Sequence, residues 1–71
     1  MHRTTVISKA LRSVGYDPDL RILEIEFASG NIYRYLGVPD VLHAGLMTAV
    51  SHGEFFTANI RDAGFKYQQI T

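Results

Sequence analysis

The strongest constraint on the fold is a run in which apolar and acidic side chains alternate. Leu23, Ile25 and Phe27 occupy every second position, and Glu24 and Glu26 stand between them. Successive side chains of a β-strand point to opposite faces, so this alternation predicts a strand with one face buried and the other in water. Such a strand needs a partner strand beside it and an apolar layer over its buried face.

The partner strand is predicted immediately downstream, across the loop Ala28-Ser29-Gly30. A three-residue loop places Gly30 where a positive φ angle is required, which glycine adopts without strain. Three cross-strand pairs define the resulting register: Ile25 with Tyr33, Leu23 with Tyr35, and Glu24 with Arg34. A two-residue loop would instead set the two tyrosines beside Glu26 and Glu24. We expect the three-residue loop, because it gathers apolar side chains on one face and joins opposite charges on the other.

Turn-forming residues place the other strands. Asp17-Pro18-Asp19-Leu20 suits a type I turn and ends a short strand around Val14 and Tyr16. After a turn at Asp62-Ala63-Gly64, residues 65–70 alternate again. This last segment predicts a strand at the edge of the sheet.

Two helices are predicted between these strands. Asp40 suits a helix N-terminus, where its carboxylate can accept bonds from free backbone N–H groups. Apolar residues then recur at helical spacing: Leu42, Leu46, Ala49 and Val50. Gly53 is expected to end this helix in a left-handed conformation. A shorter helix over residues 54–61 should follow and bury Phe56 and Ile60.

Length and composition fit one small α+β domain over residues 1–71. We expect an antiparallel sheet, made of a β-hairpin plus short flanking strands, packed against one main helix and a second short helix. The chain has no cysteine, so its apolar core must supply the stability, roughly 3–5 kcal/mol for a domain of this size. A hydrophobic content of 46% is sufficient for such a core.

Charge and hydropathy restrict the partners. Seven basic and seven acidic residues cancel, so any basic surface must be local and long-range attraction to nucleic acid is weak. The polar start Met1-His2-Arg3-Thr4-Thr5 does not fit a signal peptide, and no apolar run is long enough for a membrane span. The sequence therefore predicts a cytoplasmic protein with no membrane partner.

Several motifs in one order resemble the KTSC domain family. They are F-A-S-G-N-I-Y-R-Y-L-G-V-P, ending at Pro39, then A-V-S-H-G-E-F-F, then I-R at Ile60-Arg61. The likeness extends from Val6-x-Ser8 to Tyr67, and the one departure is Lys9, where the family often has a second hydroxyl residue. That family is named for a short domain at the C-terminus of some lysyl-tRNA synthetases. The resemblance implies an α+β fold and an RNA-binding role without catalysis.

RNA or tRNA is the expected partner, bound by an accessory module. Arg12, Arg34, Arg61 and Lys66 are the candidate phosphate contacts, and exposed Tyr33 and Tyr35 would stack bases. One basic surface would form if the two ends of the chain lie side by side, made of the cations near those ends: Arg3, Lys9, Arg12, Arg21, Arg61 and Lys66. The three-residue loop, however, sets both rings beside Leu23 and Ile25, so we favour the interpretation that the tyrosine rings belong to the core and that the cations are ordinary surface charges.

Arg61 has a structural alternative of its own. It lies at a helix end, where a cation favours free carbonyl groups, and from there it could reach Ser51 or the turn at Gly53.

The sequence predicts no enzyme, metal site or cofactor. His43 and His52 do not have the spacing of metal ligands, and Ser51 lies in no nucleophile motif. We expect Ser51 to cap or link the two helices. The rival to RNA binding is a protein-interaction or structural module, in which the exposed terminal strand pairs with another protein or a second copy of the chain.

Overall fold

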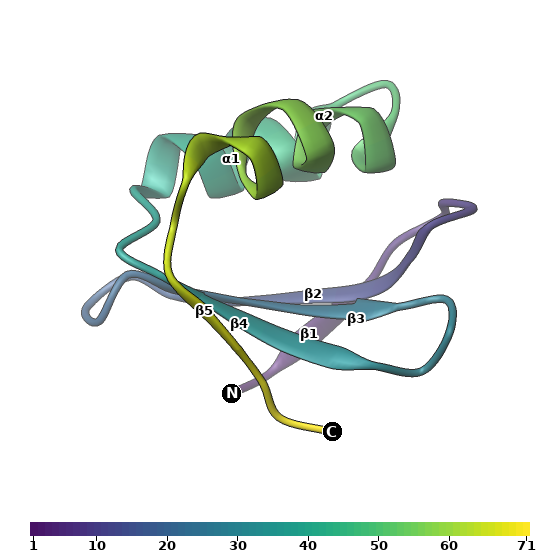
Figure 1. The fold of residues 1–71 in the computed structure, drawn as a ribbon. Helices are drawn as coiled ribbons and strands as arrows, with labels where there is room; N and C mark the ends of the chain where they lie inside the picture. The colour runs from purple at the N-terminus through teal and green to yellow at the C-terminus, as the bar shows by residue number, and fades with distance from the viewer.

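The computed structural model describes all 71 residues and has two layers. The strands are β1 (Arg3–Thr5), β2 (Leu11–Asp17), β3 (Ile22–Phe27), β4 (Ile32–Leu36) and β5 (Tyr67–Gln69). The helices are α1 (Asp40–Thr48) and α2 (His52–Asn59), and a 3-10 turn covers Arg61–Ala63. Figure 1 shows both helices on one face of the sheet, while the other face stays uncovered. The predicted α+β class is confirmed.

The sheet is antiparallel throughout, in the order β1-β2-β3-β4-β5. This order confirms β5 as an edge strand. It also places β1 and β5 at opposite edges, so the two ends of the chain do not lie side by side. Strand β1 was not predicted, because its three polar residues show no alternation of apolar and polar side chains.

The hairpin between β3 and β4 has the expected register. Leu23 pairs with Tyr35, Glu24 with Arg34, and Ile25 with Tyr33. Gly30 has a φ of 96°, as the three-residue loop requires. Odd-numbered residues of this hairpin therefore face the helices, and even-numbered residues face the uncovered side.

The core lies between the sheet and the helices. Its fully buried members come from both layers: Leu11, Val14, Leu23, Ile25, Tyr35, Val38, Leu46, Phe56 and Ile60. Tyr16 fastens β2 to the residues that precede α1, because its hydroxyl donates to the carbonyl oxygen of Val38 at 2.6 Å. The ring of Tyr16 also stacks on His43 of α1, with ring centroids 4.6 Å apart.

The predicted boundary between the helices was wrong. α1 ends at Thr48, and Gly53 lies inside the first turn of α2 without a positive φ. The reason is Ser51, whose hydroxyl accepts a hydrogen bond from the backbone N–H of Glu54 at 3.2 Å and starts α2 earlier. Ser51 is thus a cap, as expected. Val50, expected in the core, is fully exposed in the extended link between the helices.

Candidate functional site: an aromatic groove and an arginine face

The six residues predicted to bind RNA do not form one site. Tyr33, Tyr35 and Arg61 line one groove on the helix side of the sheet. Arg34 projects from the opposite, uncovered face, and Arg12 joins it there through Glu26. Lys66 lies between these two surfaces, next to β5, where its carbonyl oxygen accepts a bond from the N–H of Leu36 at 2.8 Å.

The first surface, which we call the aromatic groove, is defined by Phe27, Tyr33, Tyr35, Phe56, Arg61 and Tyr67. The three tyrosines form a cluster because β4 and β5 pair Tyr35 with Tyr67. Ring centroids are 6.4 Å apart for Tyr33 and Tyr35, 5.6 Å for Tyr35 and Tyr67, and 5.9 Å for Tyr33 and Tyr67. Aromatic side chains therefore form a continuous wall at this edge of the sheet.

The rings of the aromatic groove differ in exposure. Tyr35 is 5% exposed and forms the floor, which confirms its interpretation as a core residue. Tyr33 is half-buried, and Tyr67 is 63% exposed. Phe56 of α2 holds the floor in place, because its ring meets Tyr35 edge-on at 5.3 Å. The groove thus has a fixed base and one accessible ring at its outer edge.

The phenol of Tyr35 stays neutral at physiological pH. Burial raises the pKa of Tyr35 above its ordinary value of 10.0, and the neighbouring Tyr33 and Tyr67 raise it further. The guanidinium of Arg61 opposes this shift but does not cancel it. The floor of the groove is therefore an uncharged aromatic surface beside a single cation.

Arg61 bonds its chain neighbour. Its Nε donates to Oδ1 of Asp62 at 3.2 Å, and both side chains are largely exposed. The expected contact with Ser51 or Gly53 was wrong, because those residues lie at the N-terminus of α2 and Arg61 follows its C-terminus. An exposed ion pair of this kind contributes about 0–1 kcal/mol, so the guanidinium can exchange it for a ligand at little cost.

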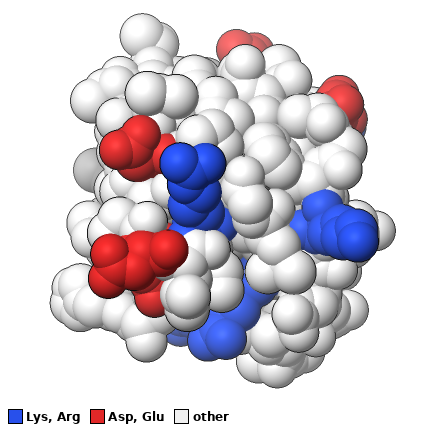
Figure 2. Space-filling view, turned by 90° about the vertical axis from the view of Figure 1, so that its left-hand side faces the viewer, with Lys and Arg blue, Asp and Glu red and all other residues white.

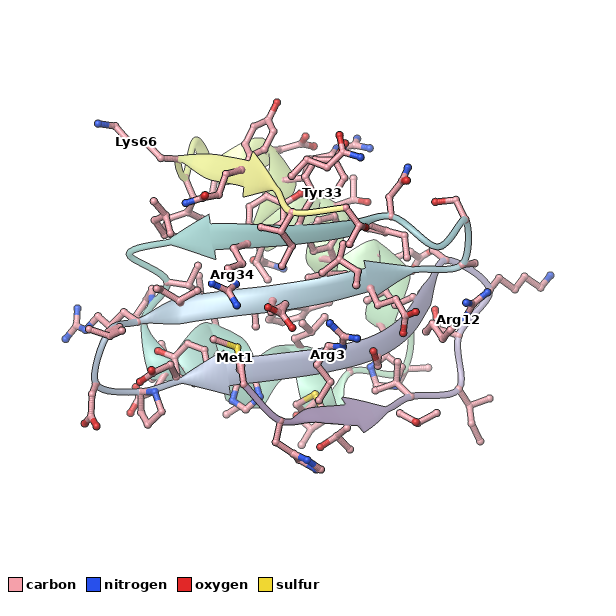
Figure 3. All side chains as sticks on the ribbon, turned by 90° about the horizontal axis from the view of Figure 1, so that it is seen from below. Met1, Arg3, Arg12, Tyr33, Arg34 and Lys66 are labelled. Carbon is pink, nitrogen blue, oxygen red and sulfur yellow. The ribbon has the colours of Figure 1, made fainter.

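The second surface, which we call the arginine face, lies on the uncovered side of the sheet. At its centre the carboxylate of Glu24 accepts from Arg3 Nη1 at 2.7 Å and from Arg34 Nε at 2.8 Å. Beside it, Arg12 Nη1 lies 3.6 Å from Glu26 Oε2, and Arg12 Nη2 donates to the carbonyl oxygen of Ala28 at 2.9 Å. In Figure 3 the side chains of Arg3 and Arg34 extend toward one another across the strands between them.

Three residues of these surfaces have roles that were not predicted from the sequence. Arg3 was counted only among the cations near the start of the chain, because its contact with Glu24 depends on β1 pairing with β2 at Gly15. Glu24 was expected only as the cross-strand partner of Arg34 and is in fact the shared partner of two arginines. Tyr67 carried a usable signal, since alternation in the last strand puts its ring on the same face as Tyr35 once the two strands pair.

Basic side chains form no continuous field at one end of the molecule. Figure 2 shows the end at the left of Figure 1, where separate blue groups alternate with red ones. This distribution agrees with the overall neutrality of the chain. Any recognition of an anion must therefore come from locally arranged groups.

Ionisation of Glu24 makes part of the stability dependent on pH. Burial raises the pKa of Glu24, but the hydrogen bonds and charges of Arg34 and Arg3 outweigh it and hold the pKa below the usual 4.5. As the pH falls below that value, the unfolded chain takes up a proton first. The contribution of the Glu24 ion pairs to the free energy of unfolding is therefore complete above pH 4.5. It is lost as the pH falls through the pKa of Glu24 in the folded chain.

We expect this loss to appear in urea denaturation curves recorded from about pH 6 to about pH 3. The free energy of unfolding of the native chain should fall more steeply than that of Glu24→Gln over this range. The same dependence of the free energy of unfolding on pH in both proteins would contradict a stabilising role for the Glu24 ion pairs.

Two of the three histidines, His43 and His52, have structural contacts. His43 packs against Tyr16, and burial lowers the pKa of His43 below its usual value. His52 Nδ1 lies 2.7 Å from the carbonyl oxygen of Leu46 and ties the start of α2 to α1. Neither helix is long and apolar enough to cross a membrane.

Comparisons with known proteins agree on one family. The family model described as "KTSC domain" matches residues 7–67. The crystal structure of a KTSC domain protein from Yersinia pestis superimposes with a TM-score of 0.93 at 44% identity, covering 99% of this chain and 97% of that one. An uncharacterized protein of Stutzerimonas stutzeri is 41% identical over 70 residues, which is 99% of each chain.

A third similarity lies within larger proteins. A lysine–tRNA ligase of a Nostoc species is 36% identical over 61 residues, which is 86% of this chain but only 11% of the ligase. The ligase of Nostoc punctiforme matches over the same share of its length at 33% identity. The family model covers most of the chain and the solved KTSC domain protein covers nearly all of it, so the chain belongs to the KTSC domain family.

Proposed function

We propose that this chain is a cytoplasmic, non-enzymatic accessory domain that binds single-stranded RNA, tRNA included. The observation that carries the proposal is the aromatic groove, in which the rings of Tyr33, Tyr35 and Tyr67 meet the guanidinium of Arg61. Proteins that bind single strands combine stacking rings with nearby cations, and each stacked base contributes about 1–3 kcal/mol. Residues 1–71 act together as one domain in this proposal.

The geometry of the groove favours an unpaired base over a duplex. Tyr67 is 63% exposed at the outer edge, and Tyr33 is half-buried beside it. A base can lie against these rings only if its own face is free, which is the case in single strands, loops and ends. Tyr35 and Phe56 stay buried and keep the two outer rings in place.

Two cations are the candidate phosphate contacts of a strand bound in the groove. Arg61 lines the groove itself, and Lys66 precedes Tyr67 in the chain. Each phosphate contact to a single strand adds about 0.7 to the slope of log affinity against log salt. Because the chain has no net charge, binding should be weak at physiological salt and strongest at low ionic strength.

The lysine–tRNA ligase of Nostoc supports the choice of RNA. Its name states that it acts on tRNA, and the segment that matches this chain is a small part of it. An RNA-binding domain attached to such an enzyme would add contacts to the tRNA that the enzyme already holds. A domain of this size would contribute affinity through the effective concentration that the covalent link provides.

Tyr67→Ala is expected to weaken binding of a single-stranded oligouridylate by about 5-fold to 150-fold at low salt, the equivalent of one lost stacking contact. Tyr67→Phe should bind like the native chain, because it keeps the ring and loses only the hydroxyl. Fluorescence anisotropy with a labelled oligonucleotide measures both affinities. Equal affinities for the alanine and phenylalanine variants would show that the ring does not stack a base, and undetectable binding by the native chain would refute the proposed function.

A further inference from the structure

We infer that the arginine face is a second ligand site, which binds the phosphodiester backbone of the same RNA strand and is organised by Glu24. The inference deepens the proposed function and rests on it for the identity of the ligand. Its own basis is separate, since it depends on the pairing of Arg3, Glu24 and Arg34 and on no residue of the aromatic groove.

The charges of this face are layered. The carboxylates lie beneath, with side-chain exposures of 4% for Glu24 and 21% for Glu26. The guanidinium groups stand above them, at 29% for Arg3, 39% for Arg34 and 56% for Arg12. An approaching ligand therefore meets cations first, even though each arginine has a carboxylate partner.

The local charge has the sign that a phosphate requires. The arginine face together with Lys66 at its rim carries four cations and two carboxylates, a net charge of +2 in a chain whose total is zero. The carboxylate of Asp17 lies at the end of the same face, near Arg34, and lowers this charge to +1. The face as a whole therefore stays positive.

Glu24 fixes the two central guanidinium groups relative to one another. Each of its oxygens accepts one bond, from Arg3 on β1 and from Arg34 on β4. A guanidinium has five N–H donors in a planar fork, so most donors of both arginines remain for a ligand. Planar forks of this kind match the oxygens of a phosphate in pairs, and holding them in position beforehand reduces the entropy lost on binding.

The path from the groove to this face is short. β4 supplies both surfaces, because Tyr33 and Tyr35 point to the helix side and Arg34 to the uncovered side. Only β5 lies outside β4, and one strand spacing is about 5 Å. A single strand of RNA that stacks on Tyr67 can therefore turn around this edge past Lys66, which Figure 3 shows extending outward beyond β5, and continue over Arg34.

The test compares two variants with the same change in net charge. The triple variant Arg3→Gln, Glu24→Gln, Arg34→Gln loses two cations and one carboxylate, so it leaves no buried charge unpaired. Arg21→Gln also lowers the net charge by one unit but lies outside the face. The probes are a labelled oligouridylate and inorganic polyphosphate, which has no bases.

We expect the triple variant to bind both probes about tenfold more weakly than the native chain, and to reduce the salt slope for the oligonucleotide by about 1.4, the equivalent of two phosphate contacts. Arg21→Gln should stay within about twofold of the native chain for either probe. Unchanged polyphosphate affinity in the triple variant would overturn the inference.

Two further variants keep the test decisive. Arg3→Lys with Arg34→Lys keeps both positive charges and is expected to keep the fold, and it should still lose affinity because an ammonium lacks the planar fork. Glu24→Gln should weaken binding although it removes a negative charge, and tighter binding would overturn the positioning role of Glu24. Tyr67→Ala should affect the oligonucleotide alone, so loss of the groove function and loss of the arginine face give different patterns across the two probes.

Discussion

Phe56→Ala is expected to leave most of the protein unfolded at room temperature. Phe56 is 4% exposed and its ring meets Phe27 and Tyr35, in each case at 5.3 Å and nearly edge-on. Removing a buried phenylalanine ring costs about 3–5 kcal/mol, through lost transfer energy and the cavity that remains. The free energy of unfolding of a domain of this size without disulfides is roughly 3–5 kcal/mol in total. The loss from this one cavity is therefore as large as the whole stability of the domain.

Circular dichroism and urea denaturation measure this loss. The matched control is Tyr67→Ala, which also removes an aromatic ring from the cluster but at a position that is 63% exposed. Its free energy of unfolding should change by less than about 1 kcal/mol. A Phe56→Ala variant that keeps a cooperative transition close to that of the native chain would show that the floor of the groove is not part of the core.

Gly15→Val is expected to displace β1 and to lower the stability by about 1–3 kcal/mol. A Cβ atom at Gly15 would lie 2.8 Å from the backbone oxygen of His2 and 3.0 Å from Cγ of Arg3. The obstructing oxygen belongs to the backbone and cannot rotate away, so the edge strand itself has to move. Because Arg3 travels with that strand, its bond to Glu24 is lost as well.

Two measurements separate this effect from general unfolding. Thermal denaturation gives the change in stability, and the Arg3 Nε–H resonance reports whether the guanidinium is still held. Thr4→Val serves as the control, since it places a valine at an exposed position of β1, where it exchanges a hydroxyl for a methyl and meets no close contact. If Gly15→Val kept both the native melting temperature and the native Arg3 resonance, the close contact of β1 with β2 would not be a constraint.

The hairpin could be predicted from the sequence because two independent patterns required the same register. A slip by one residue would have moved every side chain of β4 to the other face and put tyrosines beside glutamates. The structure has the predicted pairs of Leu23 with Tyr35 and Glu24 with Arg34. Burial of Tyr35 followed from that register and is confirmed.

The link between the helices could not be predicted with the same certainty because two signals competed there. Gly53 favoured the end of a helix, while Ser51 favoured the start of the next one. The hydroxyl of Ser51 forms a specific bond to the N–H of Glu54, whereas a glycine at this point is only permissive. The capping residue therefore determined the boundary, and Val50 was left in solvent.

The candidate surfaces were only partly accessible from the sequence. Tyr33, Tyr35 and Arg61 were named, and the fold brings them together in one groove. Arg12 and Arg34 were named for the same surface but lie across the sheet, because residue parity on β4 sends Arg34 to the opposite side from its tyrosine neighbours. Arg3 depends on a contact between residues 21 positions apart, and no local pattern encodes such a contact.

The most direct test of RNA binding is a titration of the 15N-labelled chain with a single-stranded oligouridylate at low ionic strength. We expect progressive amide shifts for Tyr33, Arg61 and Tyr67 around the groove and for Arg34 on the opposite face, all reduced by added salt. Spectra that do not change at any ratio of oligonucleotide to protein, or shifts confined to the far ends of the helices, would contradict RNA binding at these two surfaces.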